Sequence, residues 1–385
     1  MIRSSLLGVT LAGSLWLLAG CASADPSPRS KGGSSHSGGD PLAADSLRAV
    51  PVGRFDFESS SPDDRTLAAE ELSGLARLGR DDYLAVSDAH AVVHRLTIRI
   101  DPATGAVRSA TIGSPIPLRD ESGARLPEPA NAKDREALVC DPDSGEIWIA
   151  DERTGADPKP PSIARHRLSD GVRTALLTCD HDSMLTVFRR IRSNKGFESL
   201  GLAPDGSALW TANEDALTID GAAAGKSEPG FVRLQQLDRA LRPLAQFAYP
   251  VDPWRYSIRS PILLSGQEVS GLSEILALPR GRLLALERTF SGDARGMPAL
   301  ENRLYLVDPS GATDIASLRS GLAGRSYVAA KKVLLWRKGW GLTNSNFEGM
   351  ALGPTLADGS RSLILIADND GGTAQALFTL RLVAP

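Results

Sequence analysis

Five stretches of this chain share one pattern of apolar and polar positions. In each, an acidic residue precedes an apolar run, a turn containing Gly or Asp follows, and a second apolar run ends in acidic or amide residues. The clearest copy joins Asn194-Lys195-Gly196-Phe197-Glu198-Ser199-Leu200 through a turn at Pro204-Asp205-Gly206 to Leu209-Trp210-Thr211-Ala212-Asn213-Glu214. Two short apolar runs joined by such a turn predict an antiparallel β-hairpin.

The same pattern returns along the chain at intervals of 62 to 80 residues. Its opening glutamates are Glu71, Glu136, Glu198, Glu268 and Glu348. Between copies lie two further strand-like runs, as at 94–100 and 107–112. Four strands per repeat, each repeat a radial sheet, predict an all-β fold, a β-propeller of four-stranded blades. The repeat count gives five blades, and six would result if one blade lacked the pattern.

The two ends of the repeat region predict how the ring closes. The run at 52–57 precedes the first copy, and the run at 376–383 follows the last. We expect these two runs to pair and complete the final blade. A β-sandwich would also contain many short strands, but it would not explain the recurrence of one pattern.

The first residues have the parts of an export signal. Basic Arg3 precedes an apolar run from Leu6 to Leu18 that is too short to span a bilayer. Leu18-Ala19-Gly20-Cys21 resembles the bacterial lipobox, in which the cysteine is lipidated and becomes the mature N-terminus. The alternative is an ordinary signal peptide cut near Ala24. We therefore expect a signal peptide at 1–20, the lipidated Cys21 with a flexible stalk at 21–45, and one folded domain at 46–385.

The lipobox also predicts where in the cell the protein is located. The stalk is rich in Pro, Gly and Ser and has almost nothing apolar to bury. Lipid on Cys21 would bind the membrane. Ala22 after the cysteine favours the outer membrane, so we expect a lipid-anchored protein of the cell envelope that faces the periplasm.

The net charge bears on the possible partners, and the cysteines bear on disulfide formation. A net charge of −3 and the lack of a basic cluster predict no nucleic-acid partner. Cys140 and Cys179 would either form a disulfide in the oxidising envelope or remain buried thiols. Nothing in the sequence indicates an oligomeric state.

The hairpins predict a concentration of carboxylates. The start of the first strand and the end of the second lie at the same edge of an antiparallel hairpin. In a propeller these ends gather at one mouth of the central channel, where carboxylates repel one another unless cations are present. Ca²⁺ takes six to eight oxygen ligands. As a hypothesis, its candidate ligands are Glu198, Asn213, Glu214, Glu348, Asp368 and Asn369.

Cationic side chains within the same repeats indicate an anionic substrate. Carboxylates, a metal and basic groups together suit a small-molecule phosphate or carboxylic ester, whose transition-state charge they would stabilise. The candidate catalytic residues are Glu136, Glu198, Glu287, Glu348, Arg135, Lys195, Arg288 and Lys331. A serine esterase would require Gly-x-Ser-x-Gly, which is absent from the sequence.

Several of these phrases resemble a known family. Asn194-Lys195-Gly196-Phe197-Glu198, Leu286-Glu287-Arg288 and Asn346-Phe347-Glu348-Gly349 with Asp368-Asn369 are similar to the phytase-like family described as "esterase-like activity of phytase". The resemblance runs from about Glu71 to Leu382. It implies a metal-assisted phosphoesterase or esterase without naming a substrate. Asp370 departs from the family, which often has a second amide there.

A second function class fits the same features. Propellers often serve as binding platforms, and a fold alone does not decide function. The alternative is a tethered, non-catalytic binding propeller whose acidic ring holds structural calcium.

Overall fold

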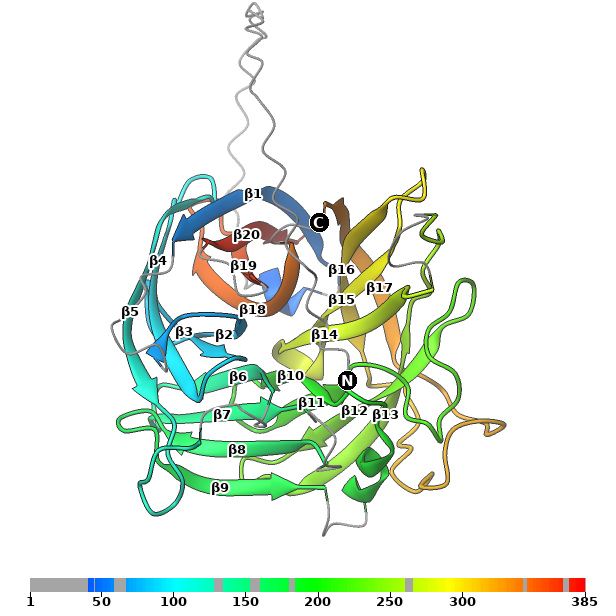
Figure 1. The fold of residues 1–385 in the computed structure, drawn as a ribbon. Helices are drawn as coiled ribbons and strands as arrows, with labels where there is room; N and C mark the ends of the chain where they lie inside the picture. The colour runs from blue at the N-terminus through cyan, green and yellow to red at the C-terminus, as the bar shows by residue number, and fades with distance from the viewer. Residues whose placement is uncertain are drawn as a thin grey trace, which may run out of the picture. The chain divides into compact units, whose positions relative to one another are not determined.

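The fold is a ring of five antiparallel sheets, each with four strands (Figure 1). The computed structural model describes residues 41–44, 46–58, 67–127, 134–152, 160–179, 184–259, 266–341, 345–369 and 374–384. Cys21, residues 22–40 of the predicted stalk and Asp370 lie outside the described residues. The predicted all-β propeller is confirmed, and the number of blades is five.

The first three blades follow one another along the chain. Blade 1 contains β2 (Leu72–Arg77), β3 (Asp82–Ser87), β4 (Val92–Ile100) and β5 (Val107–Pro117). Blade 2 contains β6 (Arg135–Asp141), β7 (Glu146–Asp151), β8 (Ser162–Arg167) and β9 (Arg173–Thr178). Blade 3 contains β10 (Phe197–Leu202), β11 (Leu209–Asn213), β12 (Gly230–Leu237) and β13 (Pro243–Val251).

The last two blades close the ring. Blade 4 contains β14 (Val269–Ala277), β15 (Leu283–Gly292), β16 (Pro298–Asp308) and β17 (Lys331–Trp340). Blade 5 contains β18 (Asn346–Thr355), β19 (Arg361–Asp368), β20 (Ala374–Val383) and, from the start of the domain, β1 (Arg48–Glu58). Because β1 pairs antiparallel with β20, the predicted pairing of the two ends is confirmed.

Helical structure is minor in the part of the chain that the structure describes. It consists of the short 3₁₀ helices η1 (Pro41–Ala43), η3 (Leu185–Arg190) and η4 (Pro279–Gly281). None of these described helices has the length and apolar character needed to cross a membrane.

The first strand of each blade lies nearest the axis. In Figure 1, β2, β6, β10, β14 and β18 surround the centre, and each contacts the next around the ring. Inner strands pack against neighbouring blades on both faces. The run Ser362–Asp368 of β19 is therefore buried throughout, and its central residues Leu363–Ala367 form a continuous apolar sequence, whereas the outermost strand β9 has no fully buried residue.

The hydrophobic core is divided among the five interfaces between blades. Trp148 of blade 2 packs with Phe197 of blade 3, and Tyr249 of blade 3 packs with Tyr305 of blade 4. Phe347 and Phe378 of blade 5 lie with Leu304 of blade 4. Two further clusters join blade 1 to blades 5 and 2. Each blade is thus held by both neighbours, which fixes the inner strands around the axis.

Candidate functional site

Every innermost strand has a β-bulge near its start. One residue lacks a partner on the neighbouring strand; these residues are Gly74, Glu136, Glu198, Ser273 and Glu348. A bulge redirects the side chain that it contains. Three of the five opening glutamates of the repeat therefore occupy equivalent, specially directed positions.

The other two opening glutamates lie elsewhere. Glu71 precedes β2, and its backbone N–H donates to Asn369 Oδ1 at 3.1 Å. Glu268 precedes β14 and accepts from the N–H of Ile258 at 2.7 Å. Gly74 and Ser273 take the bulge positions in those blades, so the carboxylates are concentrated on blades 2, 3 and 5.

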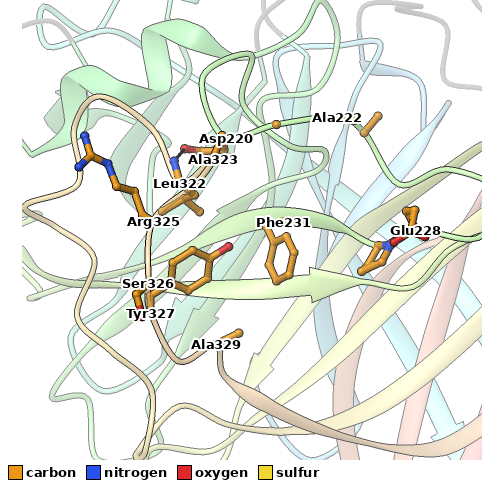
Figure 2. Close-up of a pocket in the computed structure, with 14 residues that line it drawn as sticks. Asp220, Ala222, Glu228, Phe231, Leu322, Ala323, Arg325, Ser326, Tyr327 and Ala329 are labelled. Atoms are coloured by element: carbon orange, nitrogen blue, oxygen red, sulfur yellow. Dashed lines mark hydrogen bonds between the residues drawn. The ribbon is translucent and has the colours of Figure 1, made fainter.

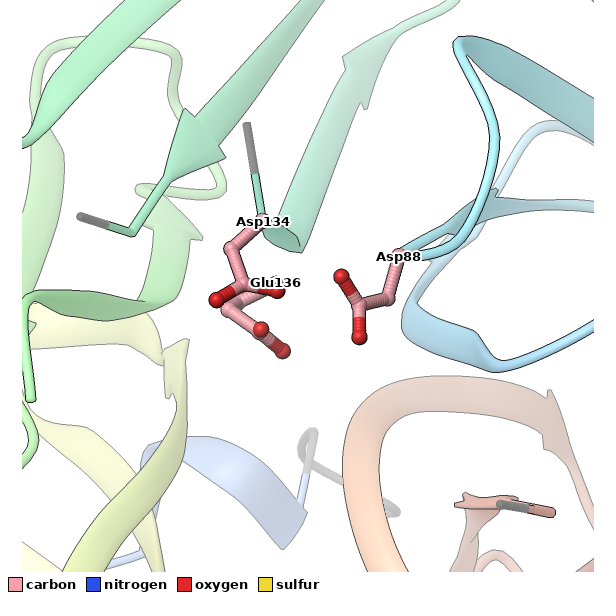
Figure 3. A group of neighbouring side chains, drawn as sticks. All are labelled: Asp88, Asp134 and Glu136. Carbon is pink, nitrogen blue, oxygen red and sulfur yellow. The ribbon is translucent and has the colours of Figure 1, made fainter. Parts of the chain in front are cut away.

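In the part of the chain that the structure describes, eight carboxylates form a continuous group around the axis, which we call the acidic centre. Its members interact electrostatically with one another and come from four blades: Asp88, Asp134, Glu136, Glu152, Glu198, Glu214, Glu348 and Asp368. Two subsets are tighter, with one oxygen of each member within 4.8 Å of the others. The first contains Asp88, Asp134 and Glu136, which face one another in Figure 3. The second contains Glu152, Glu198 and Glu214.

Two cationic side chains enter this group. Lys195 Nζ pairs with Glu214. Arg288 bridges blades, because its guanidinium pairs with Glu348 and also lies 3.2 Å from Glu214 Oε1. The same guanidinium donates to Asn346 Oδ1 at 2.6 Å. Among the described residues, eight carboxylates against two cations leave an excess of six negative charges if every carboxylate is ionised.

The pKa values of these carboxyl groups show how strongly the site opposes their ionisation. Burial raises the pKa of Glu136 and Glu198 well above the usual range, and neighbouring carboxylates add to the effect. Burial and a hydrogen bond with Asp134 raise the pKa of Asp88 to about 11. Burial raises the pKa of Glu152 to about 8. Burial also opposes ionisation of Glu214, but Lys195 and Arg288 outweigh it and lower the pKa of that carboxyl.

The polar contacts of the acidic centre are incomplete. Oε2 of Glu152 is buried and has no hydrogen-bond partner among the described residues. Ser73 Oγ lies 3.2 Å from Oε2 of both Glu136 and Glu348, although its single proton can serve only one of them. Additional protons or cations are needed to satisfy these oxygens.

Three predicted catalytic residues lie away from the acidic centre. Glu287 is fully buried beside Tyr249 and Lys332, at 2.8 Å from the tyrosine hydroxyl and 2.5 Å from the lysine Nζ. Lys331 is exposed on β17, the outermost strand of blade 4. Arg135 is buried, and its Nε lies 3.8 Å from Asp151 Oδ1. The remaining predicted catalytic residues are all at the centre: Glu136, Glu198, Glu348, Lys195 and Arg288.

The predicted metal ligands divide in the same way. Glu198, Glu214, Glu348 and Asp368 belong to the acidic centre. Asn213 is occupied by backbone, since its Oδ1 accepts from the N–H of Arg233 at 3.0 Å and its amide donates to the carbonyl of Asp215. Asn369 accepts from Glu71, as described above.

The structure adds three residues to the site that the candidate lists do not include. Asp88 and Glu152 are closing acidic residues of their repeats, so the pattern contained a signal for them. Asp134 directly precedes the second copy, and its carbonyl accepts from the N–H of Glu152 at 2.7 Å. Asp134 joins the site because the packing of blade 2 against blade 1 brings it beside Asp88.

Comparisons with known proteins identify a family. The phytase-like family model, described as "esterase-like activity of phytase", matches residues 68–371. No curated protein sequence matches the chain.

Solved structures resemble the chain only distantly. A putative oxidoreductase (glucose dehydrogenase) from Thermus thermophilus has a TM-score of 0.38 and 13% identity, covering 86% of this chain and 100% of its own. A mannose phosphorylase from Leishmania mexicana has a TM-score of 0.37 and 9% identity, covering 81% of this chain and 84% of its own. Likenesses of this size carry no inference about activity.

Proposed function

The chain belongs to the phytase-like family, and from this premise we propose that it hydrolyses phosphate or carboxylic esters with a divalent cation, calcium, held at the acidic centre. We further propose that lipid on Cys21 anchors it in the cell envelope, at the outer membrane and facing the periplasm. The observation that carries the first proposal is that, among the described residues, eight carboxylates of the acidic centre meet two cationic side chains. Such a group is stable only when protons or cations neutralise it.

The residues of the second tight subset fit a cation best. Glu152, Glu198 and Glu214 each offer an oxygen to a common point, and Oε2 of Glu152 is buried without a partner among the described residues. Lys195 already pairs with Glu214, so Glu152 and Glu198 would be the principal ligands. A set of oxygen donors alone is what calcium prefers.

The chain's own residues supply the rest of the chemistry. A bound divalent cation would neutralise charge on the ester and make water a better nucleophile at neutral pH. Arg288 and Lys195 are partly accessible, with 16% and 24% of their side chains exposed, and would bind the developing negative charge. Asp88 is half-buried beside Asp134, and burial raises its pKa to about 11, so Asp88 would hold a proton at neutral pH and give it to the leaving oxygen.

A hydrolysis assay tests this proposal. Residues 40–385 form one compact unit that contains the complete ring, so they suit expression without the signal peptide and stalk. This protein would be assayed on p-nitrophenyl phosphate, bis-p-nitrophenyl phosphate, phytate and p-nitrophenyl acetate, with calcium or with EDTA. We expect turnover that requires calcium and is lost in Glu198→Gln and Glu348→Gln. Glu58→Gln is the matched control, because Glu58 is exposed on the outer strand β1.

The possible outcomes separate the two function classes. Hydrolysis that survives both EDTA and the two substitutions would refute catalysis at the acidic centre. No turnover, together with a calcium-dependent rise in melting temperature, would instead support a binding propeller with structural calcium. Anchoring is tested separately: the full-length protein should incorporate labelled palmitate and sediment with membranes, whereas Cys21→Ser should do neither.

A further inference from the structure

A cavity of about 570 Å³ at the periphery of blade 3 is lined by three arginines. Arg189 and Arg190 belong to η3, and Arg319 belongs to the connection between β16 and β17. Among the described residues, no carboxylate lines this cavity. We propose that this cavity, the arginine pocket, binds a phosphate-bearing small molecule at a site separate from the acidic centre.

The two segments that carry the arginines, η3 and the connection between β16 and β17, are both bound to one short stretch of backbone. The connection between β11 and β12 provides that stretch, at 216–221. Thr218 donates through its N–H and its hydroxyl to the carbonyl of Arg190, at 2.9 and 3.0 Å. The end of η3 is therefore fixed through the backbone carbonyl of Arg190.

A fully buried ion pair fixes the second segment. Arg233 Nε and Nη2 bind Asp220 at 2.7 Å each, and both side chains are inaccessible to solvent. Arg233 also donates to the carbonyl of Leu318 at 2.8 Å, and Asp220 accepts from the N–H of Leu322 at 3.1 Å. Arg319 thus lies in a loop that is held at both sides of it.

Close packing makes this arrangement specific. Gly321 has φ +114°, and a Cβ at this position would lie 1.9 Å from the carbonyl oxygen of Ile219. Only glycine permits the loop to approach so closely. The arginines therefore project from a rigid frame, which lowers the cost of ordering them around a ligand.

The neighbouring cavity has a different character. Its volume is about 660 Å³, and Asp220 and Leu322 are among the residues that line it (Figure 2). Phe231 and Tyr327 meet there edge to face, with ring centres 5.8 Å apart. Its charged lining is mixed, with Arg325 and Glu228 both present. Of these two cavities, the arginine pocket is the one whose described charged lining residues all have one sign, so we assign the preference for an anion to that pocket.

The chemistry of arginine indicates the class of ligand. A guanidinium is always protonated and presents donors in a planar fork that matches phosphate oxygens. Basic residues at a helix C-terminus are locally favourable, which accounts for Arg189 and Arg190 but not for Arg319 on another segment. The cavity is larger than a phosphate group, and Val187 and Ile219 provide apolar surface for the body of a ligand.

Calorimetry tests the proposal on residues 40–385. Inorganic phosphate and phenyl phosphate would be titrated at low salt with EDTA present, so that a cation at the acidic centre does not contribute. We expect binding that weakens at least tenfold in the double variant Arg190→Gln, Arg319→Gln. The double variant Arg99→Gln, Arg337→Gln removes the same charge from exposed positions on blades 1 and 4 and should bind normally. The pair Arg190→Lys, Arg319→Lys keeps the charge without the fork and should be intermediate.

The source of the phosphate is tested with vesicles. Co-sedimentation with phosphatidylcholine vesicles that contain phosphatidic acid would identify a lipid headgroup, provided that it is lost in the double variant Arg190→Gln, Arg319→Gln. Binding of the soluble phosphates without co-sedimentation would identify a free metabolite. No phosphate binding by the unmodified protein, or an equal loss in both glutamine pairs, would overturn the proposal. The lysine pair still tests it if the glutamine pair does not fold.

Discussion

Glu287 and Arg288 are consecutive residues of β15 whose side chains enter different environments. Glu287 accepts hydrogen bonds from the Tyr249 hydroxyl and the N–H of Asp252, at 2.8 and 3.1 Å. Arg288 pairs with Glu214 and Glu348 at the acidic centre. Successive side chains of a strand point to opposite faces, which explains the separation. Of these two charges, only that of Arg288 serves the acidic centre.

Removing the Arg288 charge should destabilise the protein strongly at neutral pH. In Arg288→Gln, Glu214 and Glu348 would lose their shared cation while remaining buried. Loss of one partner from a buried ion pair costs about 3–5 kcal/mol, which urea unfolding would measure at pH 7. The difference from the unmodified protein should narrow in acid as the carboxylates bind protons.

Arg99→Gln provides the comparison for this effect, because Arg99 is exposed on β4. It should change stability by no more than about 0.5 kcal/mol. Equal stabilities of the two variants at pH 7 would show that the bridge from Arg288 contributes nothing.

The metal-free protein should lose stability as the pH rises from about 4.5 to 8. The pKa of Glu152 rises on folding from 4.5 to about 8, chiefly through burial. Between these values the folded state holds a proton that the unfolded state has released, so the free energy of unfolding falls with pH. One such group contributes a slope of at most about 1.4 kcal/mol per pH unit.

Glu152→Gln isolates this contribution. In EDTA, the free energy of unfolding of this variant should fall less steeply with rising pH. The variant should also be more stable than the unmodified protein at pH 8. Urea unfolding at several pH values measures both. An unchanged slope would mean that Glu152 is not the group that holds the proton.

The five blades could be predicted because each repeat carries its own local signal. Two apolar runs with a turn specify a hairpin, and a strand buried on both faces, as at Leu363–Ala367, is apolar without a break. The closure of the ring also followed from the sequence, since the runs at either end had no other partner. Local pattern and global fold agree at these positions.

The members of the acidic centre could be predicted only in part. Glu287 and Arg288 were both candidates in the sequence, but successive side chains of β15 point to opposite faces, so only Arg288 lies at the centre. Gly74 and Ser273 occupy bulges where the repeat suggested Glu71 and Glu268. Asp134 becomes part of the site through contact between blades, which no local pattern contains.

Calcium should stabilise the protein, and the two tight subsets should respond differently to substitution. A ligand that binds only the folded state at 100 times its dissociation constant adds about 2.7 kcal/mol. We expect Glu198→Gln to abolish the calcium-dependent rise in melting temperature. Asp88→Asn should leave most of it, because Asp88 belongs to the other subset. The reverse result would place the cation among Asp88, Asp134 and Glu136.

The two cysteines of the folded domain should be unreactive thiols until the protein unfolds. Cys140 and Cys179 are not joined by a disulfide, and Cys179 is fully buried. Burial, with a smaller effect of Asp141, raises the pKa of the Cys140 thiol to about 12, so little thiolate is available at neutral pH. Titration of residues 40–385 with Ellman's reagent should detect almost no thiol in buffer and two in guanidinium chloride. A count of zero under both conditions would indicate a disulfide.

A single glycine should prove necessary for the geometry of the acidic centre. Gly271 of β14 pairs with Arg288 of β15. A Cβ at Gly271 would come within 2.5 Å of Glu214 Oε1 and 2.6 Å of Glu214 Cγ. Glu214 has almost no accessible space, so Gly271→Ala should displace its carboxylate from Lys195 and Arg288. We expect a cost of about 1–3 kcal/mol and a weaker calcium-dependent rise in melting temperature. Gly311→Ala, where a Cβ meets nothing within 4 Å, should change neither. If Gly271→Ala responds to calcium as Gly311→Ala does, the position of Glu214 does not determine cation binding.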